Sequence, residues 1–462
     1  MRNASLFRMV FVGLLLCSTM LTRADKKICL LADTHVLSPL LTVDPDELAN
    51  GKTMQELSVP IFDQLIQKVI NDRPDALLIC GDLTRDGEPE SHEYVVNKLT
   101  EVKDEGIPVF VIPGNHDYAY GEEDGFRQTY RHFGYGDDCE QDANSLSYAT
   151  GLFPGLTLIG IGTEKQGHAR SRSIRFASEQ AKAARERGDE VIVMVHQSLI
   201  PHFYGQEAFM PFSTIDNGEI LRDSLINAGV KVVFTGHYHV TDNTRYTDAF
   251  GREIYDLCTG SPIAYPCDYR ILTFDDDLRT LKITTESVTS LEGYDNFPAY
   301  AKDRLQEAFQ TWAANWFAEH GINELVAATM SQSLADAFVI HAEGDEPMNP
   351  ATARTLAVYE DLLALAPMIG GEAGEKISEI CLSIKSMLGD YPSEAETDNI
   401  VEDLTLSIPL SGEPAGIRSL LPTTGEPAPW YTLQGQRLNG RPSGRGVYVT
   451  RGRKTVIHTN NK

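Results

Sequence analysis

Five apolar stretches of this chain each end in a polar motif, and this repeated pattern limits the folds that the chain can adopt. The stretches are 28–31, 76–80, 109–112, 191–195 and 232–234. Short apolar runs rich in β-branched residues and bounded by Gly or Pro are typical of buried strands. In open α/β sheets, ligands bind beyond the carboxyl ends of the strands. The pattern therefore predicts one crevice that receives polar side chains from five strand ends.

The polar motifs after these strands contain the residue types of metal sites. They are Asp33-Thr34-His35, Gly81-Asp82, Gly114-Asn115-His116-Asp117, Val195-His196 and Gly236-His237-Tyr238-His239. Together they offer three Asp, one Asn and five of the twelve His of the chain to one crevice. Mixed carboxylate and imidazole ligands suit Mn, Fe or Zn better than Mg or Ca. Each motif alone has an ordinary interpretation as a cap or a turn, and their convergence favours a metal site.

Helical periodicity separates the predicted strands. Apolar residues recur at helical spacing in 60–70, 94–102, 177–187 and 220–228. Alternating strands and helices over residues 26 to about 290 are typical of a layered α/β domain. The segments 270–274 and 281–285 predict a closing antiparallel pair of strands. We therefore place a catalytic domain at 25–295.

The chain of 462 residues continues well beyond this domain. Four segments of helical periodicity, 300–320, 322–341, 352–366 and 376–388, predict a small helical region over 296–390. Its aromatic residues are expected in its own core; they are Phe309, Trp312, Trp316 and Phe317. Residues 391–428 are first acidic and then rich in Pro, Gly, Ser and Thr, which predicts a linker.

The first 24 residues have the pattern of a signal peptide. Arg2 and Arg8 flank a short apolar core at 9–16, and a small residue, Ala24, ends the segment. The apolar core is too short to span a membrane, so no transmembrane helix is expected after cleavage. An uncleaved anchor and a lipid-modified Cys17 are the alternatives. We expect an extracytoplasmic protein, located in the periplasm, at the cell surface or outside the cell.

The last segment, 429–462, reverses the charge of the chain. It contains seven Lys or Arg and no Asp or Glu, whereas the whole chain has a formal net charge of −26. Residues 446–450 and 454–458 predict a hairpin with a Gly turn. The segment resembles C-terminal sorting modules of secreted Bacteroidetes proteins, which implies contact with a secretion machinery. A plain β module without a sorting role is the alternative.

Two further features restrict the partners and the covalent structure. The strongly negative net charge argues against a nucleic-acid-binding module, because such modules bind through cationic surfaces. Six cysteines lie beyond the signal peptide, and Cys29 and Cys80 are expected to be buried thiols. Cys258 and Cys267 could form a disulfide in an oxidising compartment, but their spacing alone does not decide this.

The five motifs resemble, in the same order, those of the calcineurin-like metallophosphoesterases: DxH, GD, GNH followed by D or E, a lone His, and GHxH. The resemblance covers roughly residues 26–290. It implies an α/β fold with a two-sheet β-sandwich flanked by helices and a site for two metal ions, Mn, Fe or Zn. Asp82 would bind both ions. The remaining protein ligands would be Asp33, His35 and His239 for one ion, and Asn115, His196 and His237 for the other.

The resemblance also implies a reaction. A hydroxide held between the metal ions would attack the phosphorus of a phosphate ester. His116 would stabilise the transition state or protonate the leaving oxygen. Asp117 would orient His116 or another group. Gly81, Gly114 and Gly236 are expected where a side chain would block a close approach of the backbone.

We therefore predict an exported, metal-dependent phosphoric ester hydrolase. Asp82 is followed by Leu-Thr-Arg-Asp-Gly, whereas the protein phosphatases of this family carry a longer GDxVDRG block, and this difference favours phosphodiesters over monoesters. The alternative is an exported binding or adhesion protein with a structural metal site.

Other residues near the motifs remain open. Arg85 either contacts a substrate phosphate or forms a surface ion pair, and His202 and Tyr204 either line the pocket or are incidental. The segment 118–147 is expected to be a long loop that selects the substrate.

Overall fold

A computed structural model of the chain describes residues 25–44, 48, 51–118, 123–319, 324–390, 397–410, 430–431, 437–438, 446–450 and 453–457. The predicted signal peptide, 1–24, lies outside these residues. None of the helices within the described ranges is long and apolar enough to cross a membrane. The chain divides into two compact units, one formed by residues up to 247 with 253–411, and the other by 248–252 with 412–462.

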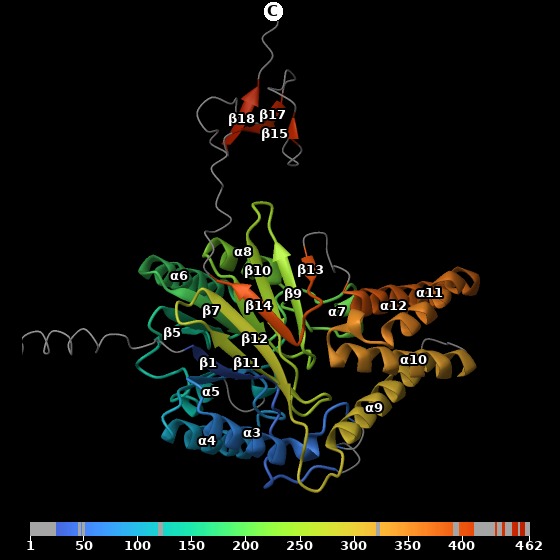
Figure 1. Ribbon diagram of the computed structural model, residues 1–462, viewed down its shortest axis with the longest axis horizontal. Helices are drawn as coiled ribbons and strands as arrows, with labels where there is room; N and C mark the ends of the chain where they lie inside the picture. Colours follow the sequence, from blue (N-terminus) through green and yellow to red (C-terminus); the bar gives the residue numbers. More distant parts are fainter. Residues whose placement is uncertain are drawn as a thin grey trace, which may run out of the picture. The chain divides into compact units, whose positions relative to one another are not determined.

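The first sheet of the larger unit has six strands in the order β14-β12-β11-β1-β2-β3. Three strands that precede polar motifs are parallel neighbours within it: β1 (Lys26–Leu31), β2 (Ala76–Cys80) and β3 (Val109–Ile112). The predicted antiparallel pair, β11 (Asp268–Phe274) and β12 (Thr280–Ser287), is also present. Helices α3 (Ser58–Asp72) and α4 (Pro89–Asp104) make the connections between the parallel strands (Figure 1).

The second sheet has eight strands in the order β13-β9-β10-β8-β7-β6-β5-β4. Its parallel centre contains the other two strands that precede polar motifs, β7 (Glu190–Val195) and β8 (Val232–Thr235). Helices α6 (Ser171–Arg187) and α8 (Gly218–Asn227) precede them in sequence. The other strands are β4 (Glu140–Gln141), β5 (Tyr148–Phe153), β6 (Leu156–Ile161), β9 (Asp242–Thr247), β10 (Glu253–Cys258) and β13 (Thr397–Asn399).

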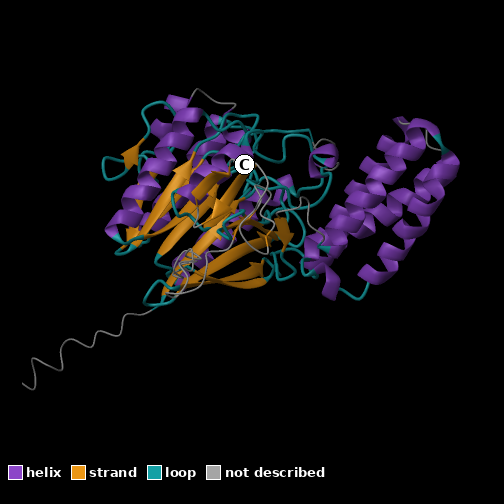
Figure 2. Ribbon diagram, turned by 90° about the horizontal axis from the view of Figure 1, so that it is seen from above, coloured by secondary structure: helices purple, strands orange, loops and turns teal. Residues whose placement is uncertain are grey.

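The two sheets share one apolar core. Buried residues of the first sheet, such as Leu30 and Leu78, belong to the same cluster as Ile192 and Phe234 of the second sheet. A separate cluster joins the second sheet to α6 and α8 through alanine and leucine side chains. The helical and strand layers are visible in Figure 2. The predicted two-sheet β-sandwich flanked by helices is confirmed.

The predicted helical region is present as four helices (Figure 2). They are α9 (Phe297–Glu319), α10 (Glu324–Glu343), α11 (Thr352–Ile369) and α12 (Gly371–Gly389). Phe309 and Phe317 are buried in its core, as expected, whereas Trp312 is 40% exposed. This core also includes Phe203, which lies in the loop after β7, and Tyr238, which lies within the fifth motif, so the helical region packs on a residue between the two histidines of that motif.

The prediction of a linker over 391–428 is wrong for residues 397–410. This stretch contains β13 and β14 (Thr405–Pro409), which are the edge strands of the two sheets. Leu406 and Ile408 lie opposite Ile283 and Leu281 of β12, and Ile408 is fully buried. The helical region is therefore inserted before the last strands of the sandwich. The two apolar residues of β14, Leu406 and Ile408, alternate with polar residues next to a Pro and were too weak a signal of a strand.

The segment 118–147 is not the long loop that we expected. It contains α5 (Glu123–Thr129) and the short strand β4. Phe126, Tyr130 and Phe133 are buried in the main core. Because these aromatic side chains anchor the segment, only a few of its residues are free to select a substrate; residues 119–122 lie outside the described ranges.

The C-terminal unit contains a four-stranded sheet in the order β16-β15-β17-β18. The predicted hairpin is formed by β17 (Gly446–Thr450) and β18 (Arg453–Ile457), which pair antiparallel. The other two strands, β15 (Trp430–Tyr431) and β16 (Arg437–Leu438), are only two residues long. The sorting role of this segment stays a prediction.

The cysteines among the described residues are free thiols. The Sγ of Cys258 lies 3.3 Å from the carbonyl oxygen of Gly236 and is not bonded to Cys267. The structure therefore does not contain the disulfide that the sequence left open.

Candidate metal centre

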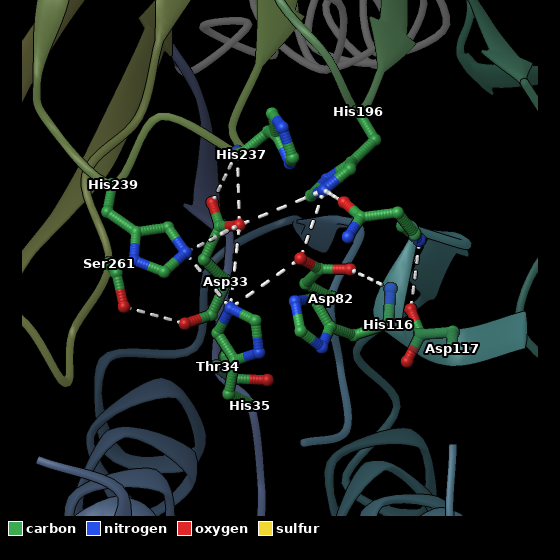
Figure 3. A network of polar contacts seen from close by, with 12 residues as sticks. Asp33, Thr34, His35, Asp82, His116, Asp117, His196, His237, His239 and Ser261 are labelled. Carbon is green, nitrogen blue, oxygen red and sulfur yellow. Dashed lines mark hydrogen bonds and ion pairs between the residues drawn. The ribbon is translucent and has the colours of Figure 1, made fainter. Parts of the chain in front are cut away.

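The polar motifs meet beyond the carboxyl ends of β1, β2, β3, β7 and β8, where the two sheets come together (Figure 3). Two sets of side chains could each hold a metal ion, with the ligand atoms of a set within 4.8 Å of one another. The first set is Asp33, His35, Asp82 and His239, and the second is Asp82, His196 and His237. Asp82 is common to both sets, so this carboxylate lies where one ligand could reach two ions.

In the first set, imidazole nitrogens and carboxylate oxygens face one another at short distances. The Nε2 atoms of His35 and His239 are 3.0 Å apart. Nε2 of His239 is 3.4 Å from Oδ1 of Asp33, and Nε2 of His35 is 3.5 Å from Oδ2 of Asp82. Figure 3 shows both rings turned towards these carboxylates.

The second set lies on the other side of Asp82. Nε2 of His196 is 3.2 Å from Oδ2 of Asp82 and 3.2 Å from Oδ1 of Asn115. The ring of His237 lies edge-on to the ring of His196, with the centroids 5.1 Å apart. Asn115 is thus adjacent to the second set, where the sequence had placed it.

The backbone of the site is strained at the positions of these ligands. Asp33, His35, Asp82, His237 and His239 all have positive φ, between 39° and 65°. Such a conformation costs a residue other than Gly about 1–3 kcal/mol and persists only where the surroundings enforce it.

Hydrogen bonds between the loops hold this strained backbone. The amide of Asp33 donates to the carbonyl of Gly81 at 3.0 Å, and the amide of His35 donates to the carbonyl of Asp82 at 2.9 Å. The amide of His237 donates to the carboxylate of Asp33, at 2.8 Å from Oδ2. The three motif loops therefore fix one another.

Glycines in the motifs leave room for the ligands, as predicted. A Cβ at Gly114 would overlap with the Asp82 carboxylate, and one at Gly81 would overlap with the His196 ring. A Cβ at Gly236 would lie 2.5 Å from Oδ2 of Asp33.

Backbone carbonyl groups orient two of the histidines. Nδ1 of His196 is 2.8 Å from the carbonyl oxygen of Cys80, and Nε2 of His237 is 3.1 Å from that of Phe212. A proton donated to each carbonyl leaves the lone pair on Nε2 of His196 and on Nδ1 of His237. Such contacts to the second ring nitrogen are typical of histidines that bind metals.

The charge states of the site suit a cation. Burial lowers the pKa of His35, His237 and His239 to about 3, so these imidazoles are neutral and have lone pairs to donate. Burial also opposes a charge on His196, but the adjacent Asp82 carboxylate raises its pKa to about 9. Two buried carboxylates together with three neutral imidazoles form the kind of donor set that Mn, Fe and Zn ions prefer.

His116 lies at the rim of the site. Its amide donates to Oδ1 of Asp82 at 2.8 Å, and its ring lies 4.9 Å from the ring of His35. Nδ1 is 3.0 Å from Oδ1 of Asp86, a residue that we did not predict. Burial opposes the charge on this ring, but the hydrogen bond to Asp86 and the charge of Asp82 raise its pKa. The sequence feature that could have indicated this contact is the acidic residue Asp86, four positions after Asp82.

Asp117 is buried and orients loops rather than His116. Its carboxylate accepts hydrogen bonds from the amides of Leu83 at 3.1 Å, Thr84 at 3.0 Å and Gly114 at 2.9 Å. The sequence left open whether Asp117 orients His116 or another group. The second role fits, because these bonds join the loop of Asp82 to the loop of Asn115.

The structure places three further candidates away from a direct role. His202 is fully buried between Asp242 and Asp256, with nitrogen–oxygen distances of 3.2 and 3.6 Å. Nε of Arg85 lies 3.8 Å from Oδ2 of Asp86, which fits the predicted alternative of an ion pair rather than a contact with substrate phosphate. The amide of Tyr204 donates to Ser386 of α12 at 2.9 Å, so this residue links the loop after β7 to the helical region.

Part of the chain is similar to known proteins. Residues 26–241 match the family model described as calcineurin-like phosphoesterase. A serine/threonine-protein phosphatase, CPPED1 from Pongo abelii, is 26% identical over 208 residues, which are 41% of this chain and 62% of that protein. A probable cyclic nucleotide phosphodiesterase from Synechococcus sp. is 34% identical over 87 residues, covering 19% of this chain and 29% of that one.

Among solved structures, a dimetal phosphatase from Danio rerio superposes with a TM-score of 0.45 and 12% identity, covering 57% of this chain and 96% of that chain. The chain spans about 62% of the length of the first of the curated relatives that it matches.

Proposed function

We propose that this chain, whose residues 26–241 match the calcineurin-like phosphoesterase family model, hydrolyses phosphate esters at a site for two metal ions. One observation carries the proposal: two sets of potential ligands, contributed by loops after strands of both sheets, share the carboxylate of Asp82. A metal site with a purely structural role would need neither a shared carboxylate nor a histidine at its open rim.

In this proposal the carboxylate of Asp82 would be a ligand of both metal ions. Asp33, His35 and His239 would complete the protein ligands of one ion, and Asn115, His196 and His237 would complete those of the other. Two such ions activate a water molecule and neutralise charge on the phosphoryl oxygens. Mn, Fe and Zn fit the donor set.

His116 donates a proton to the leaving oxygen. Its Nδ1 is held by Asp86, so the proton on Nε2 is the one available at the rim. Burial opposes a charge on His116, but the Asp86 hydrogen bond and the Asp82 charge raise its pKa, which favours the protonated ring that a proton donor needs. Asp86 is a positioning residue, because it acts through His116.

We favour phosphodiesters as substrates. The segment after Asp82, Leu-Thr-Arg-Asp-Gly, lacks the longer block of the protein phosphatases. Of the relatives above, one is called a phosphatase and another a cyclic nucleotide phosphodiesterase, so both ester classes belong in the test.

The test compares hydrolysis of bis(p-nitrophenyl) phosphate and p-nitrophenyl phosphate by the full chain. Each assay contains Mn²⁺, Zn²⁺ or a chelator, and the Asp82→Asn variant runs beside the wild type. Metal-dependent turnover that the variant lacks supports the site, and a faster diester rate supports the substrate preference. Folded, metal-loaded protein without turnover of either ester would refute the proposal.

We further propose export, on the basis of residues 1–24 and the basic segment 429–462. Fractionation of cells that express the full chain tests this. Recovery outside the cytoplasm that depends on residues 1–24 supports export, and a change of location after deletion of 429–462 supports a sorting role. Retention of the intact chain in the cytoplasm would contradict both.

A further inference from the structure

Phe212 combines two features that a structural role does not explain. Its side chain is 64% exposed, although it is a large apolar group. Its backbone has a φ of 69°, a conformation that is rare and costly for a bulky residue. None of the apolar clusters of the described residues includes this ring.

Phe212 is directly connected to the candidate metal centre. Its carbonyl oxygen lies 3.1 Å from Nε2 of His237, a residue of the second set of ligands. The carbonyl group of this strained residue therefore faces the histidine, while its phenyl ring is exposed to solvent.

The loop that carries Phe212 is rigid, because one carboxylate holds it. Oε2 of Glu207 accepts from the amide of Phe212 at 2.9 Å, and Oε1 accepts from the amide and the hydroxyl of Thr214, both at 2.6 Å. The amides of Ser198 and Ile215 add backbone bonds at the base of the loop. A preorganised aromatic ring binds a ligand with less loss of entropy than a mobile one.

The same loop borders apolar surface next to the other histidine of this motif. Met210, two residues before Phe212, lines a small cavity together with His239, Lys52, Leu305 and Phe309. Leu305 and Phe309 come from α9, so the helical region contributes to the surroundings of the centre. Both histidines of the fifth motif therefore have apolar neighbours, which suits a ligand with an apolar part.

We propose that Phe212 determines specificity: its ring packs against a flat aromatic ester group of the substrate, such as an aryl group or a nucleobase, while the phosphate occupies the metal centre. This inference rests on the proposed function and defines the class of substrate. An aromatic ring exposes both a flat face and an edge, and stacking of a flat group on such a ring contributes enough to change affinity at least about fivefold.

The test measures binding of phenylphosphonate and methylphosphonate to the metal-loaded full chain by calorimetry. These probes share the phosphonate group and differ in the aromatic ring. The preference of each protein is the Kd of methylphosphonate divided by the Kd of phenylphosphonate. We expect this ratio to be at least about fivefold larger for the wild type than for the Phe212→Ala variant. The Phe212→Tyr variant is expected to keep the preference, and Trp312→Ala, which removes an exposed aromatic side chain on α9, is the matched control.

Two further readouts separate recognition from a structural effect. Asn tolerates positive φ, so Phe212→Asn is expected to unfold at a temperature no lower than the wild type and still to lose the preference. With bis(p-nitrophenyl) phosphate, Phe212→Ala is expected to raise KM at least about fivefold and to change kcat little.

The outcomes distinguish this inference from the proposed function. An equal preference in the wild type and Phe212→Ala would overturn the inference, and so would a loss of preference that coincides with a loss of bound metal. Absence of hydrolysis by the wild type, with a preference for phenylphosphonate that depends on Phe212, would refute the hydrolase and retain the aromatic subsite.

Discussion

At the scale of single residues, the candidate centre depends on close contacts between three loops. Five ligand positions have positive φ, and hydrogen bonds from one loop to the next hold them there. Because Gly81, Gly114 and Gly236 allow these loops to touch, their lack of a side chain contributes as directly to the site as the ligands do.

A methyl group at Gly114 is therefore expected to disable the site. The Gly114→Ala variant would place Cβ on the Asp82 carboxylate, so we expect a loss of hydrolysis of at least about 100-fold with weaker metal binding. Gly151→Ala is the control, because a Cβ there meets no atom within 4 Å. Rates measured at saturating Mn²⁺ check this; an active Gly114→Ala variant would contradict the geometry.

Asp86 is expected to act through His116. Replacing Asp86 with Asn removes a charge that raises the pKa of His116, and we expect kcat to fall about 10- to 100-fold with little change in KM. The pH–rate profile of Asp86→Asn should lose activity at lower pH on its alkaline side than the wild type does, because the pKa of His116 falls.

A double variant tests whether the two residues form one unit. Since Asp86 acts only through His116, the Asp86→Asn change should have almost no effect in a His116→Gln background. If the two losses multiply instead, Asp86 has a role of its own.

The convergence of the candidate ligands could be predicted from the sequence better than the surroundings of these side chains. Asp33, Asp82 and His196 could be predicted because each directly follows a buried strand, and strand ends converge in this kind of fold. The roles of Asp86 and Phe212 could not, because each depends on a loop conformation that no short sequence pattern specifies. The orientation of Asp117 under the loops was open for the same reason.

At the scale of helices and strands, the prediction succeeded where the apolar pattern is distinct. Each of the five strands before a motif is a continuous apolar run, each of the four helices after residue 296 has a helical period, and all are present. The edge strands β13 and β14 were missed because few of their side chains are apolar. Pairing with a neighbouring strand, rather than local preference, makes them strands.

We expect β14 to stabilise the sandwich, whereas a linker in its place would contribute little to stability. Ile408 is fully buried opposite Leu281, so Ile408→Ala should lower the free energy of unfolding by about 2–5 kcal/mol. The exposed Thr405 of the same strand is the control, and Thr405→Ala should cost well under about 1 kcal/mol. Urea titrations of the two variants check this; equal, small losses would indicate that β14 is dispensable.

His202 is expected to link the loop after β7 to β9 and β10 in a pH-dependent way. Burial opposes its charge, but Asp242 and then Asp256 raise its pKa to about 10. A pKa raised above the unfolded value of about 6.5 means that the stabilisation is complete below that pH and is lost as the pH rises to about 10.

The variant His202→Gln should therefore lose about 3 kcal/mol of unfolding free energy at pH 6 and much less at pH 10. His168→Gln, which removes an exposed ion pair with Asp216, is the control and should change stability little at either pH. Urea titrations at both pH values decide this, and a loss for His202→Gln that does not depend on pH would show that this histidine is neutral.

At the scale of the whole molecule, the helical region and the sandwich belong to one compact unit. The helical region is inserted between β12 and the edge strands, and its core includes Phe203 and Tyr238 of the sandwich. The chain therefore returns to the sandwich after residue 390, and the domain boundary that we predicted at 295 separates residues that share two sheets.

The net charge of −26 also acts at this scale. It repels anionic substrates at long range, so a phosphate ester needs local positive charge to bind. Two metal ions at Asp82 would provide that charge where the protein itself is negative.

The most direct test of this account is a titration of the metal-free full chain with Mn²⁺ during hydrolysis of bis(p-nitrophenyl) phosphate. We predict that turnover rises until two equivalents per chain are bound, and that Asp82→Asn shows no comparable turnover at any concentration. Saturation at one equivalent, full activity of the variant, or no turnover by folded wild-type protein would contradict a hydrolytic centre in which Asp82 joins two metal ions.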